Sequence, residues 1–474
     1  MKRMEYNTPP SSSSPASKTV ASSAAKRTPY LYQAVWRWHF YAGILIAPFL
    51  VILAFSGAVY LFKPQIEGYL YRDLLQIQQP ASPRLSADEL LDYVKREYPG
   101  TAITSFTFSD DSKAAVKMSA IRSGTMSTMY ANPYTAEITG ILDNDKTFTS
   151  YFKKLHSQLL IGGTWANRLV ELAACWAVIL VITGLYLWWP RSKSAVWGTL
   201  LPRLSKPGSR RFWRDLHAVP AFWLSICMLI LIATGLPWSG VLGGQISKLA
   251  NATHTSYPPY AFSFMGKPES VTVTKEIAEH VPWATENLPV PASAAGRYLP
   301  LALQEVRDIA DKQRIELPYT ISLPQGETGV YTISSAHTRP VHNATLHIDQ
   351  YSGAVLTDVR FADYGILGKA ITLGIALHEG RLFGWVNQLL GLITCIGIVL
   401  IAVSSYVMWR KRKPQGRLGA PGRPEDRRTT RVLLLIMMLL GLLMPLVGLS
   451  LIIVLLLDLL IIRRIPSLKH WFSA

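Results

Sequence analysis

The sequence predicts an α-helical integral membrane protein with an internal duplication: four core transmembrane helices, a C-terminal apolar hairpin and two small α+β domains on the outer side. Hydrophobic residues make up 49% of the 474-residue chain. Four apolar stretches, near 38–62, 168–189, 216–238 and 386–409, are long enough to cross a hydrocarbon layer of roughly 30 Å, which takes about 20 helical residues. The intervals between the first and second stretches and between the third and fourth are polar and rich in strand-forming residues, and one histidine-led pattern occurs twice.

These boundaries divide the chain into segments. In order, we expect a disordered cytoplasmic tail (1–30), a first span (31–63), a first outer domain (64–154), an outer histidine segment with a second span (155–190), a basic cytoplasmic loop (191–214), a third span (215–238), a second outer domain (239–376), an outer histidine segment with a fourth span (377–410), a second basic loop (411–430), the apolar hairpin (431–464) and a cytoplasmic tail (465–474). Serine, alanine and proline dominate the first tail, which favours disorder. No signal peptide precedes the first span, so we expect an uncleaved anchor.

The formal net charge of +18 comes from basic residues that are concentrated in a few segments, and their positions predict the membrane topology. Lysine and arginine concentrate in the N-terminal tail and in the two basic loops, which lie on the same side of the predicted spans. Cytoplasmic segments of membrane proteins carry such an excess. We therefore expect a multi-pass membrane protein with a cytoplasmic N-terminus, both polar intervals on the outer side, lipid around its helices and no nucleic-acid partner.

The apolar run at 432–462 is longer than one span needs. As a single straight helix it would extend about 46 Å at 1.5 Å per residue. Met444-Pro445 near its centre, followed by Gly448, predicts a turn. Arginines flank both ends of the run, so we expect two short helices with both ends in the cytoplasm.

Each outer domain reads as one helix followed by four strands. In the first, Ser86 is the expected helix N-cap with Glu89 at capping-box spacing. Its strands are expected at 103–108, 114–118, 127–131 and 138–142, with a turn at 132–135. The second domain repeats this order, with a helix at 301–312, strands at 320–323, 330–334, 344–348 and 355–359, and a turn at 349–353. Either domain alone would have a thin core, so docking on each other or on the membrane helices would stabilise them.

The duplication is clearest at the histidines that open two of the spans. His39 precedes Gly57 by 18 residues, and His217 precedes Gly235 by the same spacing. Eighteen residues are five helical turns, so each glycine lies on the face of its histidine, about 27 Å along the axis.

His156 and His378 begin the matching segments before the second and fourth spans. Each follows a leucine and stands six residues before a glycine, and a Trp-x-Asn motif comes next. The topology places both at the outer face, whereas the other two histidines lie at cytoplasmic helix starts. The expected pairs are therefore His39 with His217, and His156 with His378.

Two pairs of imidazoles facing each other across transmembrane helices are typical of axial haem ligation. The chain has no Cys-x-x-Cys-His attachment motif, so we predict two haem b groups per chain, each held by two histidines. This ligation leaves no open iron position and favours electron transfer. No dinucleotide fingerprint follows a strand, so the electron donor is expected to be a membrane quinol, a cytoplasmic reductase or another partner.

Glycines and arginines beside the histidines are further candidates for cofactor binding. Gly57 and Gly235 would let the outer porphyrin approach the helices, although close helix–helix packing explains them equally well. Arg37, Arg214 and Arg381 adjoin three of the histidines and could pair with haem propionates; anchoring at the membrane interface is the alternative. The other histidines are expected at the surface: His254, His280, His337, His342, His347 and His470.

The resemblance to a known family rests on three motifs. They are Trp36-Arg37-Trp38-His39, the Leu-His-x-x-Leu-Leu-Ile-Gly of 155–162 and the Thr-Gly-Leu-Tyr-Leu-Trp-Trp-Pro of 183–190. Together with the paired outer domains they resemble the PepSY-associated transmembrane family of iron-regulated membrane proteins, over roughly 33–413. This family includes inner-membrane siderophore reductases. The resemblance implies PepSY-like outer domains, a role in iron uptake, and an oxidoreductase that reduces a ferric siderophore at the periplasmic face to release Fe(II).

Two other classes of function stay open. PepSY-type domains also occur in peptidase-inhibiting propeptides, so the chain could be a membrane-anchored regulator or inhibitor of an envelope peptidase without redox activity. A transporter of iron or siderophore is weaker, because the four spans have no acidic residue near their centres.

Overall fold

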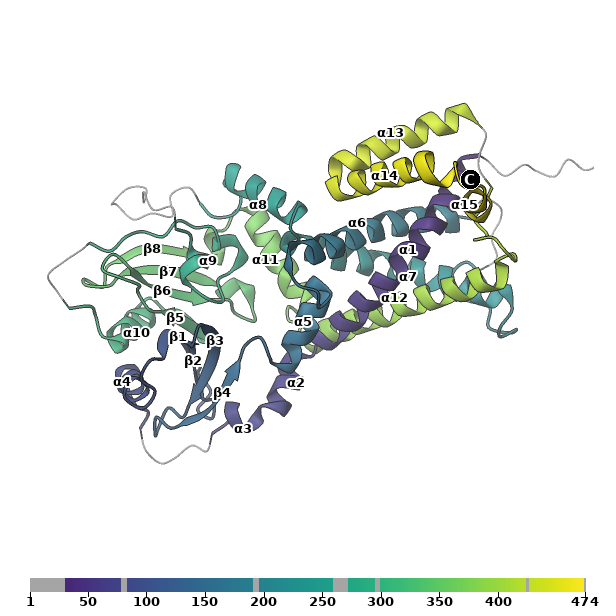
Figure 1. Cartoon of the computed structure of the whole chain (residues 1–474). Coiled ribbons are helices and arrows are strands. Elements are labelled where there is room, and N and C mark those ends of the chain that lie inside the picture. Colours follow the sequence, from purple (N-terminus) through teal and green to yellow (C-terminus); the bar gives the residue numbers. More distant parts are fainter. Residues whose placement is uncertain are drawn as a thin grey trace, which may run out of the picture.

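The structure is a computed structural model of the chain (Figure 1). It describes residues 30–77, 83–190, 196–258, 272–294, 299–422 and 426–472. The tail predicted to be disordered lies outside the described residues, except for residue 30, as do Arg191 and Lys193 of the first basic loop.

Four long helices form a bundle: α1 (Tyr30–Tyr60), α6 (Gly163–Trp188), α7 (Arg210–Gly235) and α12 (Trp385–Arg412). α1 and α7 each contact both α6 and α12. By length and composition, all four can cross a membrane, as can the stretch Pro445–Ile462. Large apolar side chains such as Leu45, Phe55 and Ile226 remain exposed on the bundle, which supports a lipid environment. The prediction of an integral membrane protein is confirmed at this level.

The C-terminal apolar run folds back on itself. α13 (Arg427–Leu443) and α14 (Pro445–Leu457) meet at Met444, where the sequence predicts a turn. A Cβ added to Gly441 would lie 3.1 Å from the Cα of Gly448, so the two helices approach closely near the turn. α14 packs on α6 and continues through a π-helical turn (Asp458–Ile462) to α15 (Pro466–Phe472), beside the start of α1 (Figure 1).

The two predicted outer domains share one eight-stranded antiparallel sheet. Its strands are β1 (Ala102–Phe108), β2 (Val116–Arg122), β3 (Thr125–Ala131), β4 (Ile138–Asp143), β5 (Tyr319–Ser322), β6 (Val330–Ser335), β7 (Ala344–Asp349) and β8 (Val355–Arg360). All eight strands were predicted to within four residues at each end. The order is β4-β3-β2-β1-β5-β6-β7-β8, so β1 and β5 join the halves, with Phe106 opposite Ile321. The two expected outer domains are therefore joined by strand pairing, which no local pattern in the sequence encodes.

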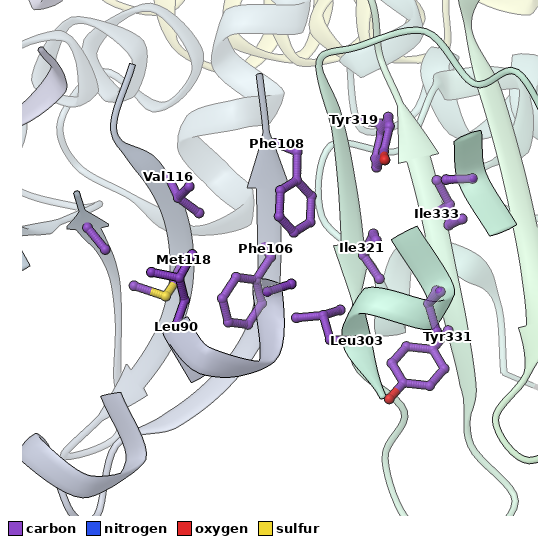
Figure 2. Close-up of a cluster of buried hydrophobic side chains, with 14 of the residues drawn as sticks. Leu90, Phe106, Phe108, Val116, Met118, Leu303, Tyr319, Ile321, Tyr331 and Ile333 are labelled. Atoms are coloured by element: carbon purple, nitrogen blue, oxygen red, sulfur yellow. The ribbon is translucent and has the colours of Figure 1, made fainter. Parts of the chain in front are cut away.

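Helices α4 (Ala87–Glu97) and α10 (Leu303–Lys312) cover one face of this sheet. Ser86 caps α4 and forms the predicted capping box with Glu89. One hydrophobic cluster runs through both halves, and Figure 2 shows its side chains from β1, β2, β5 and β6 pointing toward one another. The single core follows from the alternation of apolar and polar residues along the strands.

Short elements link the sheet to the bundle. They are α2 (Lys63–Leu70), α3 (Arg72–Leu75), α5 (Phe148–Gln158), α8 (Leu242–Ala252), α9 (Thr274–Ile277) and α11 (Ile366–His378), with short 3-10 turns at Leu236–Trp238, Trp283–Thr285, Pro340–His342 and Phe361–Asp363. α5 contacts α1 and α6, and α11 contacts α7. The sheet therefore lies at one end of the bundle (Figure 1), which we call the sheet end; the opposite end is the far end.

Candidate functional site: two histidine pairs

Four histidines of the bundle lie in two pairs. His39 on α1 and His217 on α7 have ring centroids 6.4 Å apart, with ring planes at 82°. His156 on α5 and His378 on α11 have centroids 6.2 Å apart, at 65°. All four side chains are half-buried. The first two form the far-end pair and the other two the sheet-end pair, so the residues that the topology pairs are neighbours in the structure.

Hydrogen bonds fix the ring orientation of His156. Its Nδ1 donates to the carbonyl oxygen of Leu53 at 3.0 Å and lies 3.1 Å from Ser56 Oγ. The Ser56 hydroxyl donates to the carbonyl of Ile52 at 2.7 Å, so its oxygen can accept from the imidazole. A proton held on Nδ1 leaves Nε2 with a free lone pair, the state in which histidine binds a metal.

His378 is held in the same way by α7. Its Nδ1 donates to the carbonyl of Leu231 at 2.9 Å and lies 3.2 Å from Thr234 Oγ1. Leu231 follows Leu53 by 178 residues, and Thr234 follows Ser56 by the same number, which is also the spacing between the far-end histidines. Two separate parts of the chain thus make matching contacts to the sheet-end pair.

At the far end the partners of the two rings differ. His39 Nδ1 donates to Thr183 Oγ1 at 2.9 Å, and the Thr183 hydroxyl donates to the carbonyl of Ile179 at 2.6 Å. His217 Nδ1 donates to the carbonyl of Ile401 on α12 at 3.0 Å. Here too both Nδ1 atoms are hydrogen-bonded, which leaves Nε2 as the nitrogen with an available lone pair.

Sequence reasoning did not single out the hydroxyl residues Ser56, Thr183 and Thr234. A signal for them exists, because each is followed by a glycine. A Cβ on the third such glycine, Gly184, would lie 3.3 Å from Cε1 of His39. The Ser/Thr-Gly dipeptide therefore supplies a hydrogen-bond acceptor and a space without a side chain to one imidazole.

The two predicted glycines lie against the sheet-end histidines. A Cβ on Gly57 would lie 3.2 Å from Cε1 of His156, and one on Gly235 would lie 3.0 Å from Cε1 of His378. Both distances are shorter than an ordinary carbon–carbon contact of about 3.5–4.0 Å. The glycines thus make room for imidazole rings, and their predicted contact with a porphyrin stays a prediction.

The three predicted arginines are engaged by protein groups. Arg37 donates to a backbone carbonyl of the segment before α13 at 2.6 Å. Arg214 forms an ion pair with Asp215 at 2.7 Å, and Arg381 forms one with Glu379 at 2.5 Å. Their predicted pairing with haem propionates stays a prediction.

The donor set suits a cofactor that brings most of its own ligands. Two imidazoles that bind one metal from opposite sides at about 2 Å each place their ring centroids roughly 6 Å apart. Both observed separations fit this value. Within the described part of the chain, no group of three or more His, Cys, Asp or Glu side chains could hold a bare metal ion. A porphyrin supplies the remaining nitrogen ligands itself and needs only the two axial imidazoles.

The expectation that the remaining histidines lie at the surface is wrong for His347 on β7. This side chain is fully buried and lies 3.0 Å from Thr332 Oγ1 and 3.1 Å from Thr274 Oγ1. Burial lowers its pKa to about 3. The segment around α9 covers this face of the sheet. The alternation of residues along β7 does not predict this contact.

The comparison with known families supports this architecture. No curated protein sequence matches the chain at a significant level. The model of the PepSY-associated TM region matches residues 36–412, a range that includes the four long helices, the sheet and both histidine pairs. Because the match covers most of its length, the chain belongs to the family defined by the PepSY-associated TM region.

Proposed function

We propose that the chain carries electrons across the bacterial inner membrane through two haem b groups and reduces a ferric siderophore at the periplasmic face. One observation carries the proposal: two histidine pairs, at the two ends of the bundle, have ring separations of 6.4 and 6.2 Å and Nδ1 atoms that already donate to the protein. Such pairs suit bis-histidine ligation at both ends.

When bound, haem supplies a one-electron couple at its iron. The chain's own residues hold that couple in place. The four imidazoles would hold the haem iron through Nε2, and the carbonyls of Leu53, Leu231 and Ile401 with the Thr183 hydroxyl keep Nδ1 protonated. Iron held by two histidines would supply outer-sphere electron transfer and would not bind oxygen or substrate directly.

The positions of the two pairs suit electron transfer along the axis of the bundle. They are separated by about 27 Å along α1, close to the hydrocarbon thickness of roughly 30 Å. A quinol or cytoplasmic reductase would donate at the far end, and the acceptor would bind at the sheet end. Siderophores hold Fe(III) through hard oxygen ligands, and reduction to Fe(II) weakens that hold and releases the metal.

An optical spectrum of the detergent-purified protein, oxidised and dithionite-reduced, tests the proposal, with haem quantified as the pyridine haemochrome. We expect low-spin bis-histidine bands and two haems per chain. His156→Ala and His39→Ala are each expected to remove one haem and to leave the other.

His254→Ala is the matched control, because His254 is exposed at the surface and belongs to neither pair. This variant is expected to keep both haems. A wild-type protein that stays colourless after expression with added haem would overturn the redox assignment and favour the regulator of an envelope peptidase.

A further inference from the structure

The face of the sheet opposite α4 and α10 carries two continuous rows of polar side chains. The first row runs through directly paired residues on six neighbouring strands: Ser119, Ser105, Ser322, Thr332, His347 and Thr357. The second starts at Lys117 and continues through paired hydroxyl residues: Thr107, Thr320, Ser334 and Thr345. The segment around α9 covers part of this face and meets His347, Thr345 and Ser334 through hydrogen bonds.

Part of the first row is buried without hydrogen-bond partners. Ser105 and Ser322 are each 2% exposed, and within the described part of the chain their hydroxyl groups have no partner. Beside them Glu279 Oε2 accepts from Ser119 Oγ at 2.7 Å, while Glu279 Oε1 is buried and, again among the described residues, unpaired. Buried polar atoms in proteins are nearly always hydrogen-bonded, so these atoms point to a polar ligand.

Three lysines and a histidine surround this patch. Desolvation by neighbouring protein groups lowers the pKa of Lys117, although its side chain is exposed on β2; the charge of Glu67 opposes this shift and the charge of Lys63 adds to it. Desolvation also lowers the pKa of His280, against the charge of Glu279, and the charges of Lys63, Lys117 and Lys153 add to the lowering. Lys117 lies on β2, Lys63 begins α2 and Lys153 lies on α5. α5 contacts α2 and is joined to it by the hydrogen bond from Thr149 to Glu67, so the three ammonium groups share one neighbourhood.

The carboxylates nearby neutralise this charge only in part. Glu67 lies 4.0 Å from Lys63 and accepts a hydrogen bond from Thr149. Lys117 and Lys153 are both exposed, and among the residues that the structure describes neither has a carboxylate within 4.0 Å. The patch is thus positively charged and accessible beside a buried polar row.

This patch lies next to the sheet-end histidine pair. Lys153 stands three residues before His156 on α5, about 4.5 Å along the helix axis. Lys63 opens α2 directly after α1, six residues beyond Gly57, which lies against His156. A ligand held by the lysines would therefore lie close to the electron-transfer site at this end.

We propose that the polar sheet face with Lys63, Lys117 and Lys153 binds an anionic ferric chelate with oxygen ligands, which accepts electrons at the sheet end. This inference rests on the proposed function and adds the place and the charge class of the acceptor. The lysines attract the negative charge of the chelate and donate to its oxygens beside the buried polar row. The sheet-end histidines would hold the group that delivers one electron, supplied by the donor at the far end, to the bound Fe(III), which would become Fe(II).

Binding is tested with a redox-inactive probe, so that it is measured independently of haem. Gallium(III) citrate is titrated into the full-length protein in nanodiscs at low ionic strength. We expect Lys117→Gln to weaken binding about tenfold, the loss of one charge-assisted contact. Lys117→Arg, which keeps the charge, is expected to retain most of the affinity, and added salt is expected to weaken wild-type binding.

Lys95→Gln is the matched control. Lys95 is an exposed lysine on α4, against the opposite face of the sheet, so its removal is expected to change the affinity less than twofold. Equal affinities of the wild type, Lys117→Gln and Lys153→Gln for gallium citrate would overturn the assigned site.

Transfer is tested by mixing the dithionite-reduced protein, freed of excess dithionite, with ferric citrate or with a neutral ferric trihydroxamate. Lys117→Gln is expected to slow reoxidation by ferric citrate about tenfold and by the neutral chelate less than twofold. Equal slowing with both chelates would overturn the charge preference. A wild type without haem would instead refute the proposed function, whatever the gallium titration shows.

Discussion

At the scale of single residues, the histidine pairs owe their geometry to small polar neighbours. Each Nδ1 donates to a carbonyl or hydroxyl oxygen that belongs to another helix. These contacts set the tautomer and the ring direction before any ligand arrives, so little reorganisation is needed on binding. The glycines beside the rings serve the same geometry by leaving space for them.

The space beside His378 gives a first prediction. A Cβ at position 235 would lie 3.0 Å from its Cε1, and the larger side chain of Gly235→Val would displace the ring. We expect the haem content of this variant to fall from two to one per chain, with bis-histidine bands retained from the far-end pair. Gly43→Val on α1 is the control, because a Cβ at position 43 has nothing within 4 Å. Two haems in Gly235→Val would show that the ring position is not critical.

His347 gives a pH prediction. Its pKa is about 3 in the folded state and 6.5 without the protein environment. Between these values the unfolded chain binds a proton that the folded sheet excludes, so the free energy of unfolding falls as the pH drops below 6.5. This loss is at most about 1.4 kcal/mol per pH unit. It stops near pH 3, where the folded state also binds the proton.

Hydrogen exchange of β6 and β7 amides, followed from pH 7 to pH 5, measures this effect. In His347→Gln the stability is expected to depend less on pH than in the wild type, whatever the starting stability of the variant. Equal slopes for the two proteins would show that His347 does not control the acid sensitivity.

At the scale of elements, α4 and α10 cap each other across the two halves of the sheet. The Asp88 carboxylate on α4 accepts from the backbone N–H groups of Leu303 and Gln304 at 2.8 and 2.9 Å. In return Gln304 Oε1 accepts from the N–H of Ala87 at 3.2 Å. The first turn of each helix therefore depends on a side chain of the other.

This mutual capping predicts that Asp88→Ala lowers the free energy of unfolding of the sheet by about 1–3 kcal/mol, since two buried donors lose a charged acceptor. Thermal unfolding of the membrane-reconstituted protein, or hydrogen exchange in α10, measures the change. Asp92→Ala is the matched control, because Asp92 is an acidic residue on the same helix but is exposed. We expect this substitution to change the free energy of unfolding by less than about 0.5 kcal/mol. Comparable losses in the two variants would contradict the capping role.

At the scale of the whole molecule, one sheet spans two segments that are more than 170 residues apart in the chain. β1 pairs with β5, and the Phe108 and Tyr319 rings meet across this joint at 6.0 Å between centroids. The two halves therefore fold as one body, which holds α5 and α11 together and, with them, the sheet-end histidines.

We expect residues 83–146, expressed alone, to be unfolded, because β1 would lose its strand partner and Phe106 and Phe108 would lose half of their packing. An amide NMR spectrum without dispersion is the expected result. A well-dispersed spectrum would show that the half-sheet has a sufficient core of its own. In the intact protein Phe106→Ala is expected to cost about 3–5 kcal/mol.

The sequence alone determined the features that depend on local or periodic patterns. The length of apolar runs predicts the spans, alternation predicts the eight strands, and the spacing of Ser86 and Glu89 predicts a capping box that the structure contains. The spacing of the histidines and the alternating topology predict which imidazoles are neighbours. Each of these inferences uses residues that act within one element, or the fixed rise of a helix.

Only the tertiary structure decided which distant groups meet. Nothing local indicates that β1 pairs with β5 or that His347 is covered by the segment around α9. The same holds for the Nδ1 acceptors and for the polar face between Lys117 and Glu279. These contacts join residues far apart in the chain or depend on side-chain direction, and their free energies are settled by packing of the whole molecule, which short sequence patterns do not record.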